Sequence, residues 1–468
     1  MPIHDLHEFL GILEELEELH RVRVEVDPVL EISSITARVS GQEGGGKALL
    51  FERVAGSPFQ LVTNIFGSPR RMALSLSVKN IVDVQRRMEV LLAGGDPWRK
   101  GLVSFHPVEK AGCICQEVWE GPSALNSYPF LKNWPADGAG GGGGRFITLP
   151  LVITRDPDDG TINCGMYRTE LFDDRTCGIH WRPGSGGAAH YRKYASRGLR
   201  TPVAVVVGGD PAAVVAASLP LPEEVDELAF AGFLRGEPLD VARCRTSDLV
   251  VPAAAEMVIE GYLEPGEARQ GGLFGNHTGF YASAGEVPVL RVLSISRRDA
   301  PIFPATVVGR PPMEDCHMAK VMERIMLPLT RWHLPEIEEI NLLTEGIFHG
   351  CAVISIKKTD PGQGLRVIEK LKTDGWLKGS RLLVVVDADV DPHNLSISSW
   401  RVFNNVNWSR DTITYSTPVY GSLPHGGCFG IDATRKFVEE IGSRWPEEIG
   451  MPVAVEEMVT RRWREYGL

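Results

Sequence analysis

The chain has 468 residues, of which 43% are hydrophobic and 23% are charged, so it is long enough for two or three domains with sizeable cores. Its net charge is −11 and it has no long basic run, which argues against a nucleic acid as the partner.

The cysteines and the hydropathy pattern indicate the compartment. The eight cysteines include no CxxC pair, so we expect reduced thiols in a cytoplasmic protein rather than disulfides or a zinc site. No apolar run reaches about 18 residues, and the start lacks the basic and apolar regions of a signal peptide. The sequence therefore predicts neither a membrane span nor a leader.

Residues 1–110 are expected to form a mixed α/β unit. Apolar residues recur at helical spacing from 6 to 16, with glutamates on the other side, and predict a helix. Residues 22–26 alternate between valine and charged side chains, which predicts a strand.

Residues 111–310 hold many short strand-like runs separated by turn signals, which favours a mainly antiparallel sheet or barrel. The clearest predicted strands cover residues 149–154, 203–207, 249–251 and 289–295, and predicted helices cover residues 211–218 and 223–234.

Residues 311–468 differ, because strand and helix patterns alternate there as in an α/β unit. The charged helix at residues 455–466 could pack within its own domain or reach a second subunit. The other predicted elements are a helix at 318–327, strands at 352–357 and 382–386, and a helix at 364–373 between those strands.

One hairpin in the central part carries a candidate site. Residues 145–154 and 162–168 read as strands joined by an Asp- and Gly-rich turn. Alternation places Asn163 and Gly165 on one face of the second strand and Arg168 on the other. An amide, a glycine and an arginine so close together suit an anionic ligand. A plain hairpin with a surface arginine would give the same pattern.

Other polar groups leave alternatives open. Asn163, His190 and Glu227 could supply oxygen and nitrogen ligands to Mg²⁺ or Mn²⁺, but a capping amide, a core histidine and a solvated glutamate would look alike. Glu256 and Glu260 could share a helix face, lie exposed or lie on opposite faces of a strand pair. The glycine-rich residues 138–144 lack the P-loop spacing, which favours a flexible loop over a phosphate cradle.

Several motifs in one order resemble those of the UbiD family, whose members are decarboxylases that use prenylated FMN. The resemblance covers nearly the whole chain. It rests on residues 145–150 (RFITLP), 163–168 (NCGMYR), 218–220 (SLP), 251–253 (VPA) with Glu256 and Glu260, and 274–279 (FGNHTG).

The resemblance implies three parts. They are an N-terminal α/β domain (1–110), a central antiparallel split β-barrel of flavin-reductase-like type that holds prenylated FMN (111–310), and a C-terminal α/β domain with an oligomerising helix (311–468). It also implies a homo-oligomer, a dimer or a hexamer, and a separate flavin prenyltransferase that supplies the cofactor. The implied reaction is reversible, non-oxidative decarboxylation of an aromatic acid.

The resemblance also implies site residues. Asn163, His190 and Glu227 match the ligands of Mn²⁺ (or Mg²⁺), with K⁺ as a candidate second ion, and Arg168 matches the arginine that faces the substrate carboxylate. The full cofactor-binding set comprises Thr148, Asn163, Cys164, Gly165, Met166, Arg168, His190, Ser218, Leu219, Pro220, Glu227 and Lys378.

Two positions depart from the family pattern. Many members carry carboxylates where this chain has Gly271 and Asn276, and an amide is no general acid. The remaining candidates for proton donor are His317, His277 and a water relay, while Asn276 could hydrogen-bond a polar substituent. This favours a hydroxybenzoate-type or other electron-rich acid, such as a pyrrole-, furan- or indole-carboxylate, over a cinnamate-like acid.

Two other classes remain open, a flavin oxidoreductase and a non-catalytic flavin-binding protein. The second follows from the missing acid, although the retained Arg168 and metal-ligand positions argue against it. The remaining histidines considered are expected to be structural, namely His180, His333, His349 and His425.

Overall fold

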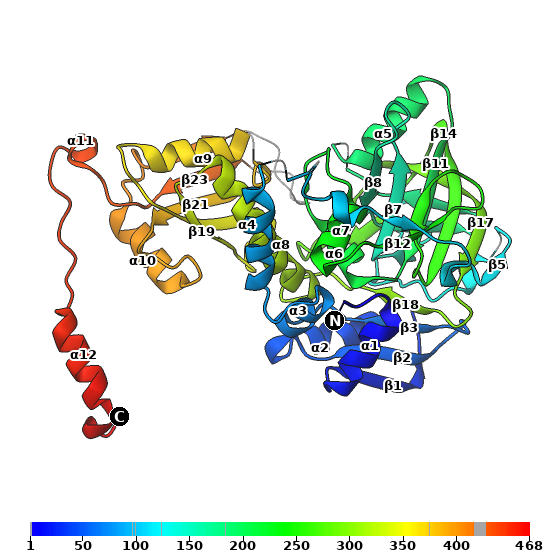
Figure 1. Cartoon of the computed structure of the whole chain (residues 1–468), viewed down its shortest axis with the longest axis horizontal. Coiled ribbons are helices and arrows are strands. Elements are labelled where there is room, and N and C mark those ends of the chain that lie inside the picture. Colours follow the sequence, from blue (N-terminus) through cyan, green and yellow to red (C-terminus); the bar gives the residue numbers. More distant parts are fainter. Residues whose placement is uncertain are drawn as a thin grey trace.

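The computed structural model describes residues 2–95, 97–98, 100–122, 124–182, 184–373, 375–415 and 427–468, so the expectation for His425 lies outside the described residues. Figure 1 shows a mixed α/β protein with several sheets. An N-terminal sheet lies below a large central sheet, and a C-terminal sheet stands to one side of both. None of the described helices is long and apolar enough to cross a membrane.

The N-terminal sheet is sandwiched by helices on two faces. Leu50 packs into the same core as the buried stripe of α1, while Phe51 packs with Ile32 of α2, as the alternation of a strand requires. The predicted helix and strand of this region are both found. The elements are α1 (Leu6–Glu15), β1 (Leu19–Val26), α2 (Glu31–Ser40), β2 (Ala48–Val54), β3 (Gln60–Thr63), α3 (Pro69–Ser75) and α4 (Val82–Ala93).

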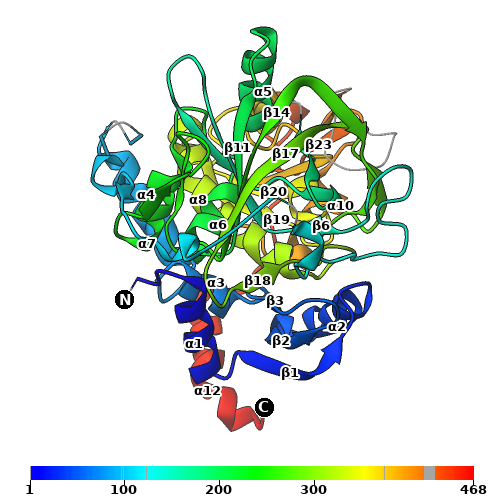
Figure 2. The same ribbon diagram turned by 90° about the vertical axis from the view of Figure 1, so that its right-hand side faces the viewer.

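A strand from much later in the sequence completes this sheet. β18 (Ile302–Ala305) pairs in parallel with β3, and the sheet order is β1-β2-β3-β18. Figures 1 and 2 both show β18 beside β3 at the upper edge of the sheet. The end of the central region is therefore hydrogen-bonded into the N-terminal layer.

The central sheet has nine strands, and each pairing within it is antiparallel. Its order is β6-β9-β10-β17-β14-β11-β7-β8, with β5 on β17. No pairing among the described residues joins β6 to β8, so no closed barrel forms. The strands are β5 (Val118–Glu120), β6 (Phe146–Ile147), β7 (Pro150–Arg155), β8 (Ile162–Gly165), β9 (Thr169–Asp173), β10 (Thr176–Ile179), β11 (Thr201–Val207), β14 (Met257–Gln270) and β17 (Glu286–Arg297).

The run predicted as one strand at 145–154 is two strands. β6 pairs with β9, whereas β7 pairs with β8 and β11, and Thr148 lies at the break. Pro150 has no backbone N–H to donate, which suits the first residue of a strand. Glu256 lies just before β14 and Glu260 lies within it, and both are buried, so they share no helix face, are not exposed and do not lie on opposite faces of a strand pair.

Smaller elements surround this sheet. The helix predicted from residue 223 begins at Glu227, because the Asp226 side chain caps it by accepting from the N–H groups of Leu228 and Ala229. The surrounding elements are β4 (Val108–Glu109), α5 (Gly186–Ser196), α6 (Pro211–Ser218), α7 (Glu227–Arg235), β12 (Asp240–Arg243), β13 (Val250–Pro252), β15 (Leu273–Gly275) and β16 (Tyr281–Ser283).

The C-terminal sheet has the order β19-β20-β21-β23-β22, and β20, β21 and β23 run parallel. The predicted strand, helix, strand alternation is found, and the helix predicted at 318–327 is longer at both ends. The elements are α8 (Glu314–His333), β19 (Ile337–Leu342), β20 (Cys351–Ile356), α9 (Gln363–Thr373), β21 (Leu382–Asp387), α10 (Leu395–Asn405), β22 (Thr412–Tyr415), β23 (Cys428–Asp432), α11 (Val438–Ile441) and α12 (Val453–Arg462).

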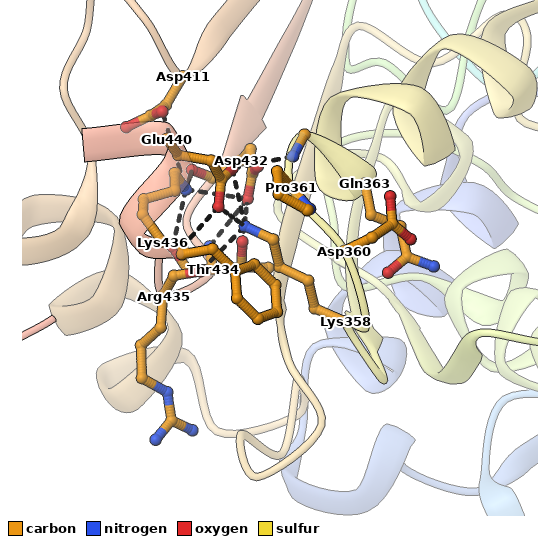
Figure 3. Close-up of polar contacts among 12 residues, drawn as sticks. Lys358, Asp360, Pro361, Gln363, Asp411, Asp432, Thr434, Arg435, Lys436 and Glu440 are labelled. Carbon is orange, nitrogen blue, oxygen red and sulfur yellow. Dashed lines mark hydrogen bonds and ion pairs between the residues drawn. The ribbon is translucent and has the colours of Figure 1, made fainter. Parts of the chain in front are cut away.

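A buried charge network lies at the carboxyl ends of the parallel strands (Figure 3). Lys436 donates to the carbonyls of Asp432 and Thr434, and Lys358 donates to both oxygens of Glu440 at 2.8 and 3.0 Å. Since buried cations are costly without partners, this network fixes where the chain leaves the sheet after β23.

The chain after this network forms an arm. Arg401 pairs with Glu448 at 2.8 Å, and beyond it α12 runs away from the body of the protein (Figure 1). None of the α12 residues is buried. Ile449, Met451 and Val453 are 99, 69 and 73% exposed, which is unusual for apolar side chains in sequence proximity.

Candidate active site

The β7–β8 hairpin holds one end of the site. Thr154 of β7 lies opposite Asn163 of β8 in the register, and its hydroxyl is 2.9 Å from Nδ1 of His190 on α5. The other ring nitrogen, Nε2, is 3.6 Å from a carboxylate oxygen of Asp156. Burial lowers the pKa of His190, which favours the neutral ring that binds metals.

Glu227 reaches the same strand from the first turn of α7. Its carboxylate accepts a hydrogen bond from the N–H of Cys164 at 3.0 Å, and burial raises its pKa to about 7. Three different elements therefore bring Asn163, His190 and Glu227 to β8, although the residues are far apart in sequence. A buried carboxylate with a raised pKa is stabilised by a nearby cation.

These residues fit a hard divalent ion. Their donor atoms are two oxygens and a nitrogen, and Oδ1 of Asn163 accepts a long hydrogen bond, 3.3 Å, from the Tyr167 hydroxyl. Gly186 approaches closely, since a Cβ there would lie 2.1 Å from Oδ1 of Asn163. Position 186 therefore has no room for a residue larger than glycine beside the Asn163 amide.

The α6–α7 connection meets the same hairpin. The N–H of Met166 donates to the carbonyl of Ala217 at 2.9 Å, which places the loop Ser218-Leu219-Pro220 beside the end of β8. Cys164 is buried below the surface. Gly165 lies under the Tyr167 ring, where a Cβ would come within 2.3 Å of that ring.

Arg168 lies between β8 and β9 at the other end of the site. Its guanidinium is 4.1 Å from the Phe274 ring centre and 5.9 Å from that of Phe146. Burial lowers its pKa to about 10, so it stays charged at neutral pH. Thr148, two residues after Phe146, accepts from the N–H of Thr306 at 2.9 Å.

Four groups around Arg168 were not singled out as functional by the sequence. The carboxylates whose charge acts on the guanidinium are Asp137, Asp315 and Glu170, and His180 contacts the last of these. Burial raises the pKa of Asp315, in the first turn of α8, to about 7. The alternation of residues 168 and 170 would have placed Glu170 on the face of Arg168, but no sequence pattern pointed to Asp315.

The predicted proton donors lie apart from each other. His277 is 3.3 Å from His349 of the short helix Phe348–Gly350, and a Cβ at Gly45 would come 2.9 Å from His317. Burial lowers the pKa of both His277 and His317 to about 4. Asn276 accepts from the Gly279 N–H through its carbonyl in the turn between β15 and β16.

Lys378 is exposed in the loop before β21, where its carbonyl accepts from Lys372. The contacts found among the described residues do not join it to the Asn163 end or to Arg168. The glycine-rich residues 138–144 are packed rather than loose. Gly138 and Ala139 bond to Leu273, and a Cβ at Gly143 would lie 2.1 Å from the Leu171 carbonyl.

Comparisons with known proteins agree with this arrangement. Three models of the 3-octaprenyl-4-hydroxybenzoate carboxy-lyase family match: the N-terminal domain at residues 10–91, the Rift-related domain at 106–311 and the C-terminal domain at 316–433. The chain is similar to uncharacterized proteins of Archaeoglobus fulgidus (41% identical, 99% of each chain) and Aquifex aeolicus (37%, 99% of each chain).

Solved structures give the same result. Vanillic acid decarboxylase of Sedimentibacter hydroxybenzoicus in closed form matches with a TM-score of 0.90 at 26% identity, over 100% of this chain and 99% of that one. HmfF of Pelotomaculum thermopropionicum in complex with prenylated FMN matches with a TM-score of 0.80 at 26% identity, over 97 and 98% of the two chains. The chain therefore belongs to the UbiD family and is a carboxy-lyase of that class.

Proposed function

We propose that the protein is a prenylated-FMN-dependent, reversible decarboxylase of an electron-rich aromatic acid. The observation that carries this proposal is the half-buried Arg168, stacked on Phe274, on the same short segment as Asn163. One chain segment thus carries two binding groups. Arg168 suits the substrate carboxylate, and the polar cluster around Asn163 suits a metal ion that binds the cofactor phosphate. The likeness to a vanillic acid decarboxylase and to HmfF with prenylated FMN supports the reaction class.

In this proposal Asn163, His190 and Glu227 would hold Mn²⁺ or Mg²⁺, whose charge would neutralise the cofactor phosphate, with K⁺ as a candidate second ion. Thr148, the backbone from Cys164 to Met166, and the loop Ser218-Leu219-Pro220 line the cofactor. Lys378 stays a predicted contact for the phosphate side. When bound, prenylated FMN supplies the electron sink that an aromatic ring lacks on loss of CO₂.

The residues around Arg168 orient the substrate, and one of them supplies the proton that replaces CO₂ on the ring. The guanidinium offers paired N–H groups to the substrate carboxylate, and Phe146 and Phe274 exclude water from it. At pH 7, His277 and His317 carry the extra proton in only about one molecule in a thousand, given a pKa of about 4. They then serve, with Asn276, as neutral hydrogen-bonding groups.

Asp315 is the better proton donor. Burial keeps its carboxyl group partly protonated at neutral pH, and its charge acts on Arg168. After CO₂ leaves, this carboxyl would give its proton to the ring carbon and regain one from water.

The substrate choice lies between a hydroxybenzoate and a pyrrole-, furan- or indole-carboxylate. The vanillic acid decarboxylase matches with a TM-score of 0.90 in its closed form but of 0.81 and 0.79 in its open forms, against 0.80 for HmfF, so the preference for the hydroxybenzoate class rests on Asn276 and Gly271 rather than on overall likeness. We also propose three domains, at residues 1–110, 111–310 and 311–468, with the central sheet as an incomplete split barrel. The enzyme would be cytoplasmic. A flavin prenyltransferase would supply its cofactor.

The exposed arm supports a homo-oligomer, a dimer or a hexamer. No described residue of the same chain covers its apolar side chains, and a second copy would bury them. One of the HmfF structures is of an evolved dimeric form.

The activity test uses protein co-produced with a flavin prenyltransferase and a panel of hydroxybenzoates, heteroaromatic acids and cinnamates. We expect CO₂ release or ring H/D exchange with one class, and a loss on the order of 100-fold or more in Arg168→Ala, because the carboxylate loses its partner. Arg192→Ala, on the surface of α5, is the control. NAD(P)H oxidation without CO₂ release would instead make the protein a flavin oxidoreductase.

The donor test follows pH. A carboxyl group that must be protonated loses activity as pH rises through its pKa, so kcat should fall about tenfold per pH unit above about 7. Asp315→Asn should lower kcat by about 100-fold or more at all pH values, whereas the exposed Asp299→Asn should not. An unchanged pH profile in the Asp315 variant would exclude it as the donor.

The metal test measures thermal unfolding of the protein with FMN, with and without Mn²⁺. An ion that binds the folded state but not the unfolded state raises the melting temperature. We expect Mn²⁺ to raise it by several degrees, and Glu227→Gln to remove most of that rise because the ion loses a charged ligand. Glu224→Gln, at an exposed position in the loop just before α7, should keep it. An equal rise in both variants would place the ion elsewhere.

The oligomer test measures molar mass in solution by light scattering. The unaltered chain should be a dimer or larger. Met451→Asp with Val453→Asp should dissociate it, since charges would enter an apolar interface, while Glu457→Gln on the same helix should not. A monomeric unaltered chain would contradict the proposed role of the arm.

A further inference from the structure

A buried carboxylate and a histidine form a pair beside Arg168 that the mechanism above does not use. Glu170 on β9 is fully buried, and one of its oxygens, Oε2, is 2.9 Å from Nε2 of His180 and accepts from the Gly272 N–H at 3.0 Å. The second oxygen, Oε1, and the second ring nitrogen of His180, Nδ1, have no hydrogen-bond partner in the part of the chain that the structure describes.

The sheet places this pair on the face of Arg168. Glu170 is two residues after Arg168, and the N–H of His180 bonds to the Arg168 carbonyl at 2.9 Å across the β9–β10 ladder. The His180 ring meets Phe146 and Phe274 edge-on, with ring centres 5.7 and 5.5 Å away. Those are the two rings that flank the guanidinium.

Glycines leave the space for this pair. A Cβ at Gly142 or Gly272 would come within 1.5 or 2.7 Å of Oε1 of Glu170, so no side chain fits at either position. A Cβ at Gly271 would touch the His180 ring at 3.4 Å. The glycine-rich residues 138–144 therefore close over Glu170 and shut it off from water.

The other two carboxylates near Arg168 are less able to act as its counter-charge. Asp137 accepts three backbone N–H groups, from Gly275, Trp134 and Asn133. Asp315 has a pKa of about 7 because of burial, so its charge is present only part of the time. By contrast, Oε1 of Glu170 is buried and has no hydrogen-bond partner among the described residues, so the charge of this carboxylate is less compensated.

We propose that Glu170, held in place by His180, is a positioning counter-charge that weakens the grip of Arg168 on the substrate carboxylate. This inference rests on the proposed decarboxylase function. The negative charge of the carboxylate disappears as CO₂ forms, so an interaction that stabilises this charge opposes the reaction. A fixed negative charge beside Arg168 raises the energy of the bound acid more than that of the transition state.

Removing the charge of Glu170 should change substrate binding and turnover in opposite directions. Glu170→Gln keeps the shape and removes the charge, so it should bind aromatic acids more tightly while turning them over more slowly. A purely structural role for Glu170 would instead weaken binding and turnover together. Glu256→Gln is the matched control, because Glu256 is also fully buried and is 3.1 Å from Nε2 of His7, away from Arg168.

Binding is measured by titrating the FMN-loaded protein with 4-hydroxybenzoate and pyrrole-2-carboxylate, and with phenol and pyrrole as analogues without a carboxylate. The Glu170→Gln variant should bind the acid about three- to tenfold more tightly than the unaltered protein, with no change for the neutral analogue. With prenylated FMN its kcat should fall. Unchanged or weaker binding of the acid would overturn the inference.

His180 gives a second pair of variants. His180→Gln keeps an N–H donor for Glu170 and should behave like the unaltered protein, whereas His180→Leu removes the donor and should tighten acid binding as Glu170→Gln does. Equal acid affinities of the His180→Gln and His180→Leu variants would contradict the role of His180. An unaltered protein that binds no acid would overturn the proposed function itself, whereas normal binding without tightening in the variants would overturn this inference alone.

Discussion

The cost of partly burying one guanidinium constrains the central part of this protein. Arg168 lies in an apolar surrounding, between two phenylalanine rings, where a cation is far less well solvated than in water. It is tolerated because aromatic faces and several carboxylates surround it. These groups come from β6, β9, β15 and the start of α8, so the packing of all four elements depends on this charge.

The β7–β8 hairpin sets the distance between the two ends of the site. Its ladder fixes Thr154 opposite Asn163, and Thr154 in turn fixes which ring nitrogen of His190 is engaged. Only a few residues separate Asn163 from Arg168, and that short span is anchored midway by the bond from Met166 to Ala217. A ligand with an anionic tail and a reactive ring would thus meet one rigid segment at both ends.

The sequence predicted the parts of this arrangement that depend on local pattern. Short strand-like runs bounded by turn signals located β7, β11 and β17, and the family resemblance pointed to Asn163, His190, Glu227 and Arg168 as site residues. It could not predict that β18 would pair with β3, because that pairing joins segments with no shared local signal. The sequence also could not predict how deeply a given side chain is buried. Asp315 looks like any helix-capping carboxylate, and only burial raises its pKa into the neutral range.

The glycine tract shows why composition alone misleads. Residues 138–144 read as a flexible loop because glycine is permissive, yet here the lack of side chains allows backbone to pack against Glu170 and Leu171. A Cβ at Gly271 would make ordinary contact with the His180 ring, at 3.4 Å, so position 271 borders the Glu170–His180 pair. In this chain the carboxylate beside Arg168 on this side of the site therefore comes from β9 and not from position 271.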